Sequence, residues 1–249
     1  GDLTVGGTII GAGKLKSVTE SSKTGVRLSA AVAANHGDIG SNAVDLSYSS
    51  STSATNGATG LASTAMGSST TASGLASTAM GYSTTAGGES STAMGNGTSA
   101  SGKYSTAMGS YTEATAWQST AMGDGTTASG TNSTAMGEGA TASGRSSVAM
   151  GDGTTASGTN STAMGNGTEA SGLASTAMGS NTKATGGHST AMGSYTEATA
   201  WQSTAMGDGT TASGTNSTAM GEGATASGRS SVAMGDGTTA SGTNSTAMG

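Results

Sequence analysis

The sequence predicts an all-β protein, a parallel β-solenoid with 14-residue coils. Three observations support this fold class. The 14 methionines lie on one lattice with a constant spacing of 14 residues, glycine recurs at fixed places in that lattice, and the 249-residue chain contains no Phe, Pro or Cys. So few large apolar residues cannot offset chain entropy through a conventional core. Stacked repeats that share a small core are the alternative.

The methionine lattice runs without an insertion or deletion from its first member to its last. We expect its members to form a packing ladder, either inside the coil or at an oligomer axis, because methionine is flexible enough to fill gaps. The ladder comprises Met66, Met80, Met94, Met108, Met122, Met136, Met150, Met164, Met178, Met192, Met206, Met220, Met234 and Met248.

The repeat unit reads S-T-A-M-G-x-x-T-x-A-S-G-x-x, and coil positions are counted from its serine. Positions 3 and 10 are always Ala, and position 5 is always Gly. Position 2 is Thr or Val and position 8 is Thr or Ala, which indicates that these sites select size more than a hydroxyl. Recurrent glycine excludes a helix, because each interior Gly costs about 1 kcal/mol relative to Ala.

Positions 2 to 4 and 8 to 10 are alternating triplets bounded by glycine, and each is predicted to be a short strand. In a strand, positions 2 and 4 share one face and positions 1 and 3 share the other. About 13 coils stacked about 4.8 Å apart would form a rod of roughly 60 Å. The narrow interior must hold Ala, Thr and some Ser. The second regular face would be left in water, so we infer that identical rods pack around a shared axis.

The two parts of the chain differ in regularity. Residues 1–60 contain no Met and are predicted to be an irregular β cap or adaptor, in which residues 43–46, followed by residues 60–62, form an irregular first coil. Residues 61–249 are predicted to be the β-roll array. Because the array stops part-way through a coil at Gly249, we expect it to continue in the native fibre. Residues 110–165 recur unchanged at 194–249, which indicates a duplication.

The coil motif resembles a known family. Asn-Ser-Thr-Ala-Met-Gly, which begins at Asn132, Asn160, Asn216 and Asn244, resembles the Asn-Ser-Val-Ala-Ile-Gly signature of trimeric autotransporter adhesin heads, which are YadA-like with Hep/Hag repeats. The resemblance covers residues 61–249 and includes the period. It implies a left-handed parallel β-roll, a homotrimer and adhesion to a host surface protein or glycan. The first ten residues instead resemble the short β segment of viral and phage tail-fibre proteins.

These features predict a structural and adhesive extracellular fibre on a cell surface or a virion surface. The alternative is a viral or phage fibre that binds a host receptor, and a minor alternative is an ice-binding solenoid that uses its Thr ladders. We expect no enzyme activity and no cofactor, because His36 and His188 are the only histidines and neither lies in a catalytic motif. The chain lacks a basic patch for nucleic acid. It also lacks the roughly 20-residue apolar run of a membrane helix.

Candidate surface sites lie at the variable coil positions. Position 6 carries an acidic ladder, interpreted as a hydrated edge or, alternatively, a weak divalent cation site: Asp124, Glu138, Asp152, Asp208, Glu222 and Asp236. The aromatic candidates for adhesion are Tyr111, Trp117, Tyr195 and Trp201, with corner packing as the alternative. Possible N-glycosylation sites are Asn96, Asn132, Asn160, Asn166, Asn216 and Asn244.

Overall fold

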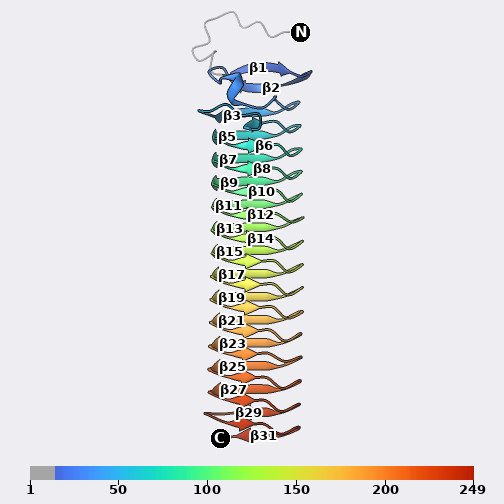
Figure 1. Ribbon diagram of the computed structural model, residues 1–249, viewed down its shortest axis with the longest axis vertical. Helices are drawn as coiled ribbons and strands as arrows, with labels where there is room; N and C mark the ends of the chain where they lie inside the picture. Colours follow the sequence, from blue (N-terminus) through green and yellow to red (C-terminus); the bar gives the residue numbers. More distant parts are fainter. Residues whose placement is uncertain (1–14) are drawn as a thin grey trace, which may run out of the picture.

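The protein is a straight rod of stacked coils with a distinct first end (Figure 1). The computed structural model describes residues 15–249. The tail-fibre-like segment at residues 1–10 therefore lies outside the described residues. Each regular coil contributes a long strand and a short strand of two residues, so the rod has two sheets along its length.

The long-strand sheet contains the strand that spans coil positions 2 to 6, or positions 2 to 4 in the last two coils. This strand is longer than the triplet predicted from the sequence. Its members in the coils are β3 (Val44–Tyr48), β5 (Thr64–Ser68), β7 (Thr78–Tyr82), β9 (Thr92–Asn96), β11 (Thr106–Ser110), β13 (Thr120–Asp124), β15 (Thr134–Glu138), β17 (Val148–Asp152), β19 (Thr162–Asn166), β21 (Thr176–Ser180), β23 (Thr190–Ser194), β25 (Thr204–Asp208), β27 (Thr218–Glu222), β29 (Val232–Met234) and β31 (Thr246–Met248).

The short-strand sheet contains positions 9 and 10, which makes each strand shorter than the predicted triplet. Its members are β4 (Gly57–Ala58), β6 (Thr71–Ala72), β8 (Thr85–Ala86), β10 (Ser99–Ala100), β12 (Glu113–Ala114), β14 (Thr127–Ala128), β16 (Thr141–Ala142), β18 (Thr155–Ala156), β20 (Glu169–Ala170), β22 (Lys183–Ala184), β24 (Glu197–Ala198), β26 (Thr211–Ala212), β28 (Thr225–Ala226) and β30 (Thr239–Ala240).

Successive coils pair in parallel, and each strand residue of the array lies beside its own copy in the next coil. Met108 is the partner of Met122, and Gly109 is the partner of Gly123. The short strands follow the same rule, with Ala114 beside Ala128. The predicted parallel β-solenoid with 14-residue coils is therefore confirmed. The left-handed sense of the coil stays a prediction.

The interior of the repeat array holds only small side chains. In the coil that begins at Ser119, the inward residues are Ser119, Ala121, Thr126 and Ala128, and each is 0% exposed. The predicted interior of Ala, Thr and Ser is confirmed. Stacked Ala leaves no space for larger groups, so the long strand can only turn its Thr and Met side chains outward.

Glycine at position 5 is required by both backbone angle and space. Gly151 has φ of +124°, and a Cβ atom there would lie 1.9 Å from the carbonyl oxygen of Gly165 in the next coil. Position 14 also has positive φ, but in the left-handed helical region that Asn tolerates. Asn132 and Asn160 have φ of 58° and 57° there. The Asn that opens the family-like motif therefore suits a turn conformation.

The N-terminal end is closed by a different structure. Strands β1 (Leu15–Glu20) and β2 (Lys23–Leu28) form an antiparallel hairpin, and β2 pairs in parallel with β3. A short 3-10 helix, η1 (Ala33–Asn35), lies between β2 and β3. The first coil is irregular, because Val44 pairs with Thr64, which is further along the chain than the regular period would place it. The hairpin covers the strand edge that this coil would otherwise expose.

Candidate functional site

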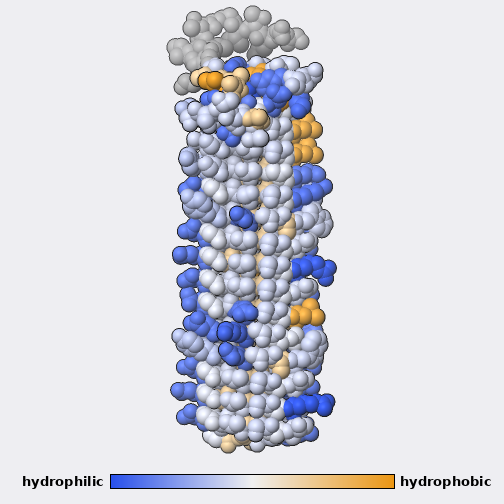
Figure 2. Space-filling view, viewed as in Figure 1, coloured by the Kyte–Doolittle hydropathy of each residue, from blue (hydrophilic) through white to orange (hydrophobic). Residues whose placement is uncertain are grey.

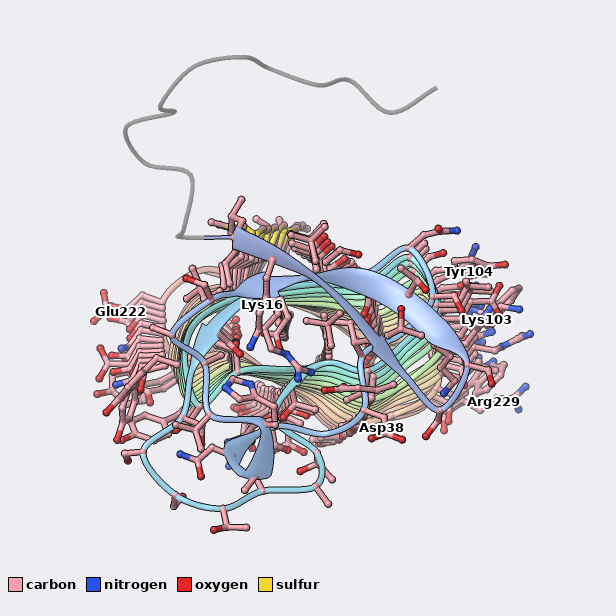
Figure 3. The ribbon with its side chains drawn as sticks, turned by 90° about the horizontal axis from the view of Figure 1, so that it is seen from above. Lys16, Asp38, Lys103, Tyr104, Glu222 and Arg229 are labelled. Carbon is pink, nitrogen blue, oxygen red and sulfur yellow. The ribbon has the colours of Figure 1, made fainter. Side chains whose placement is uncertain are left out.

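The Thr and Met side chains of the long-strand sheet form one outer face of the rod, here called the Met face (coil positions 2 and 4). Sulfur atoms line the outside of this sheet in Figure 3, and the Met side chains are half-buried in most coils of the single chain. Of the two predicted places for the methionine ladder, the interior is excluded. The fixed positions are therefore not all inward: positions 2 and 4 hardly vary and yet face outward.

The turn after the long strand forms one long edge of the rod, the 6–7 edge. Asp124 pairs in register with Glu138, and Glu138 with Asp152, so their carboxylates stack along this edge in exposed positions. The copy at Glu222 lies at the left edge in Figure 3. Within residues 15–249, no three His, Cys, Asp or Glu side chains are grouped closely enough to hold a metal ion. In the single chain the ladder forms an exposed acidic stripe, and the weak divalent cation site stays a prediction.

The turn before the long strand forms the opposite edge, the 13–14 edge. Lys103, Tyr104 and Arg229 lie there in Figure 3, across the coil from Glu222. Figure 2 shows a broad, mostly near-neutral face with hydrophilic side chains along both edges and a few hydrophilic patches on the face itself. Most charges of the array lie on these two edges, which face away from each other, and the other four, Glu113, Glu169, Lys183 and Glu197, lie at position 9 in the short-strand sheet.

The aromatic candidates do not form the paired patches that their shared coils suggest. Tyr111 occupies position 7 and Trp117 position 13, so the two lie on opposite edges. Trp117 instead lies near Tyr104 of the preceding coil, with ring centroids 6.5 Å apart. In the duplicate, Trp201 packs edge-on against His188 at 4.7 Å. Both Trp side chains are 48% exposed, so each edge cluster is open to a ligand.

The backbone differs beneath each Trp. At Gly130, as in most coils, the position-12 N–H donates to the next coil's position-10 carbonyl, here that of Ala142 at 3.1 Å. Ala116 replaces Gly at this position and makes no such bond, although Thr115 still donates to Ala128 at 3.1 Å. A Cβ atom at Gly130 would lie 2.0 Å from the neighbouring carbonyl oxygen. The extra methyl group therefore displaces the turn that carries Trp117.

A charged group adjoins the first aromatic cluster. Lys103 bridges to Glu89 at 2.8 Å, and its ammonium lies 5.0 Å from the centre of the Tyr104 ring. The hydrogen bond from Lys103 lowers the pKa of Glu89, and the same bond raises the pKa of Lys103. Both groups are exposed, so the pair orders the edge more than it stabilises the fold.

All six possible glycosylation asparagines lie in exposed positions on the two edges, outside the packed interior; Asn96 and Asn166 end long strands, and the other four lie in the turn before a long strand. Those at position 6 lie on the acidic edge, and those at position 14 lie on the opposite edge. Glycosylation at these sites stays a prediction that their outward positions permit.

A buried ionic cluster in the cap was not predicted from the sequence. Arg27 donates from Nε to Asp45 at 3.0 Å, from Nη1 to Glu20 at 2.8 Å and from Nη2 to the carbonyl of Gly37 at 2.9 Å. His36 Nδ1 lies 3.2 Å from the same Asp45 carboxylate. Burial lowers the pKa of His36 and outweighs the opposing attraction of Asp45. The sequence did contain a signal for this cluster. In residues 26–28 (V-R-L) and in residues 44–46 (V-D-L), the charged middle residue lies between two outward apolar residues, so strand alternation turns it inward.

The parallel coil, with its regular period and fixed glycines, matches a known repeat. The family model for the YadA head domain repeat matches residues 58–84, 86–112, 114–141, 142–168, 170–196, 198–224 and 226–249. The chain belongs to the YadA head repeat family. No individual curated protein matches it.

The YadA head repeats account for the whole stacked array. The family is one of non-enzymatic adhesin heads, which confirms the resemblance stated from the motif and the expectation that the chain is not an enzyme. The match does not extend to the hairpin, the 3-10 helix or the ionic cluster. In the part of the chain that the structure describes, no helix has both the length and the apolar character needed to span a bilayer.

Proposed function

We propose that this chain is part of the head of a bacterial surface adhesin, in which three parallel rods present their edges to a host surface protein or glycan. The observation that carries the proposal is the YadA head repeat match together with a regular, uncharged Met face. The family supplies the function class, and the Met face supplies the reason for assembly.

The Met face supports a homotrimer. Positions 2 and 4 hold only Thr, Val and Met through all the repeats, and they form an unbroken stripe along the rod. A contiguous stripe of this kind marks an interaction surface. Three flattened coils with this face turned toward a common axis would bury it on every chain. Met side chains would adapt to the irregular space at the axis.

The exposed aromatic residues are the leading candidates for ligand contact. Trp and Tyr provide large contact areas at little entropic cost and dominate many binding surfaces. Trp117 and Trp201 are exposed, and so are Tyr111 and Tyr195, which are 66% and 64% exposed. Six coils separate the two sets, so one trimer would present the same groups at two heights.

The adhesive role is tested with beads coated in the protein and counted on cultured host cells and on immobilised matrix protein. The Trp117→Ala/Trp201→Ala variant is expected to bind about tenfold less than wild type. Thr131→Ala/Thr215→Ala is the matched control, because it changes the same coil position one coil further along. Equal binding by all three proteins would remove the aromatic residues from the adhesive surface.

Two alternatives receive less support. The resemblance to tail fibres depends on residues outside the described part of the chain. The gene would decide: a membrane anchor after the array would exclude a viral fibre, and a chaperone domain there would support one. Ice binding would need exposed Thr ladders. Thr126, Thr154 and most other members of the position-8 ladder are buried, and the outward Thr residues of position 2 belong to the Met face that we assign to packing between chains.

A further inference from the structure

The cations of the repeat array fall into two groups. Four occur in the array, and two of them have carboxylate partners within the chain: Lys103 with Glu89 at 2.8 Å and Lys183 with Glu197 at 3.7 Å. Among residues 15–249, neither Arg145 nor Arg229 forms an ion pair. Both arginines lie at coil position 13 and are exposed.

These two arginines share their coils with the centres of the acidic ladders. Glu138 is the middle member of the stacked triplet Asp124, Glu138 and Asp152. Arg145 follows Glu138 by half a coil and therefore lies on the opposite edge at nearly the same height. The duplicate repeats the arrangement with Glu222 and Arg229, which lie on opposite edges in Figure 3.

Within one chain, this arrangement leaves the charges uncompensated. Stacked carboxylates directly beside one another on parallel strands repel. The arginine that could neutralise them is held across the full width of the coil. A neighbouring chain can bring the two edges together.

We infer that neighbouring rods of the trimer meet edge to edge in register, with Arg145 of one chain against the acidic triplet around Glu138 of the next, and Arg229 likewise against the triplet around Glu222. The inference rests on the proposed trimer. Three flat coils that turn the Met face toward one axis place each 6–7 edge beside the 13–14 edge of the adjacent chain. Rotational symmetry keeps equivalent residues at equal heights.

The same seam would bring the aromatic residues together. Tyr111 and Trp117 lie on opposite edges of one coil, as do Tyr195 and Trp201 of the duplicate. In the seam, the Tyr of one chain faces the Trp of the next at the same height. The candidate adhesive groove would then be built by two chains, with charged pairs setting the register between them.

Disulfide trapping tests this register directly, because the chain contains no cysteine. Glu138→Cys/Arg145→Cys is expected to give a closed covalent trimer on oxidation, visible on a denaturing non-reducing gel. Neither single variant can give more than traces of cross-linked dimer. Glu138→Cys/Thr159→Cys, which moves the second thiol one coil along the same edge, is the matched control and is expected to give little cross-link.

Charge reversal gives an independent readout on the same 249-residue chain. Arg145→Glu/Arg229→Glu is expected to weaken trimer formation by about tenfold or more, and adding Glu138→Arg/Glu222→Arg is expected to restore it. Lys103→Glu/Lys183→Glu carries the same change in net charge and is expected to have little effect. A wild-type trimer whose double-cysteine variant gives no closed covalent species would overturn the seam and leave the trimer standing. A wild-type monomer would overturn both.

Discussion

The same inward position of the long-strand sheet carries charged side chains in the cap and only alanine in the repeat array. Arg27 is the register partner of Asp45, Asp45 of Ala65, and Ala65 of Ala79. From Ala65 onward this position contains only Ala. Small side chains fill the interior of a coil that lies between two regular coils. The first coil has a regular coil on one side only. There, large polar side chains fill the interior and form hydrogen bonds and ion pairs with one another.

The strongest test of the array is a single methyl group at a position-5 glycine. Gly151→Ala is expected to destabilise the rod by about 4 kcal/mol or more, since the new Cβ would meet the Gly165 carbonyl at 1.9 Å on a backbone that L-residues avoid. Gly153 has φ of +58° with no atom within 4 Å of such a Cβ, so Gly153→Ala should cost about 1 kcal/mol. Thermal unfolding measures both variants, and equal losses would contradict the argument.

The corresponding test of the cap removes its buried cation. Arg27→Met leaves the Asp45 and Glu20 carboxylates without their partner, which is expected to cost about 3–5 kcal/mol. Hydrogen exchange should show lost protection in residues 15–63 and little change beyond Met94, because coils couple mainly to their neighbours.

The matched control for the cap is the exposed ion pair on the 13–14 edge. Lys103→Met removes the bridge to Glu89, in which the two side chains are 46% and 36% exposed, and should leave the stability nearly unchanged because solvent screens the pair. If Arg27→Met had an effect this small, the buried cluster would not be what closes the rod.

A smaller effect of opposite sign is expected in the array interior. The Thr154 hydroxyl is buried and has no protein hydrogen-bond partner. Thr154→Val should stabilise the rod by about 1 kcal/mol, because it removes an unsatisfied polar group and keeps the shape. Ala140 occupies the same coil position, position 8, in the preceding coil and has no hydroxyl. Chemical denaturation measures the change, and a loss of stability would mean that the hydroxyl is satisfied.

The smallest effect concerns the pH response of the cap. Burial lowers the pKa of His36 below its ordinary value of 6.5, so the unfolded chain binds a proton more readily than the folded chain. Stability should therefore fall as the pH drops below about 6.5 and level off below the folded pKa. The loss should be about 1 kcal/mol or less per pH unit, and His36→Asn should remove it. If acidification instead stabilised the wild type relative to the variant, the predicted direction of the pH effect would be contradicted.

The repeat itself explains how much could be predicted. Every coil position recurs many times, so substitution patterns identified the strands, the register and the small interior. The sequence left two places open for Met66 and its copies, because a flexible Met side chain can pack inside a coil or at an oligomer axis. The packed coil, with its stacked Ala, decided for the outward placement. The cap has a single copy of each residue, so Arg27 and Asp45 had no pattern to reveal them. The edge assignments of Tyr111 and Trp117 required the closed coil.

The central claim is that the Met face is covered by two further copies of the same rod. Sedimentation equilibrium of the full chain across a range of concentrations measures this directly. A mass of three times the 23.2 kDa chain is the predicted result. A persistent 23.2 kDa monomer would leave the Met face exposed to water and would contradict the account.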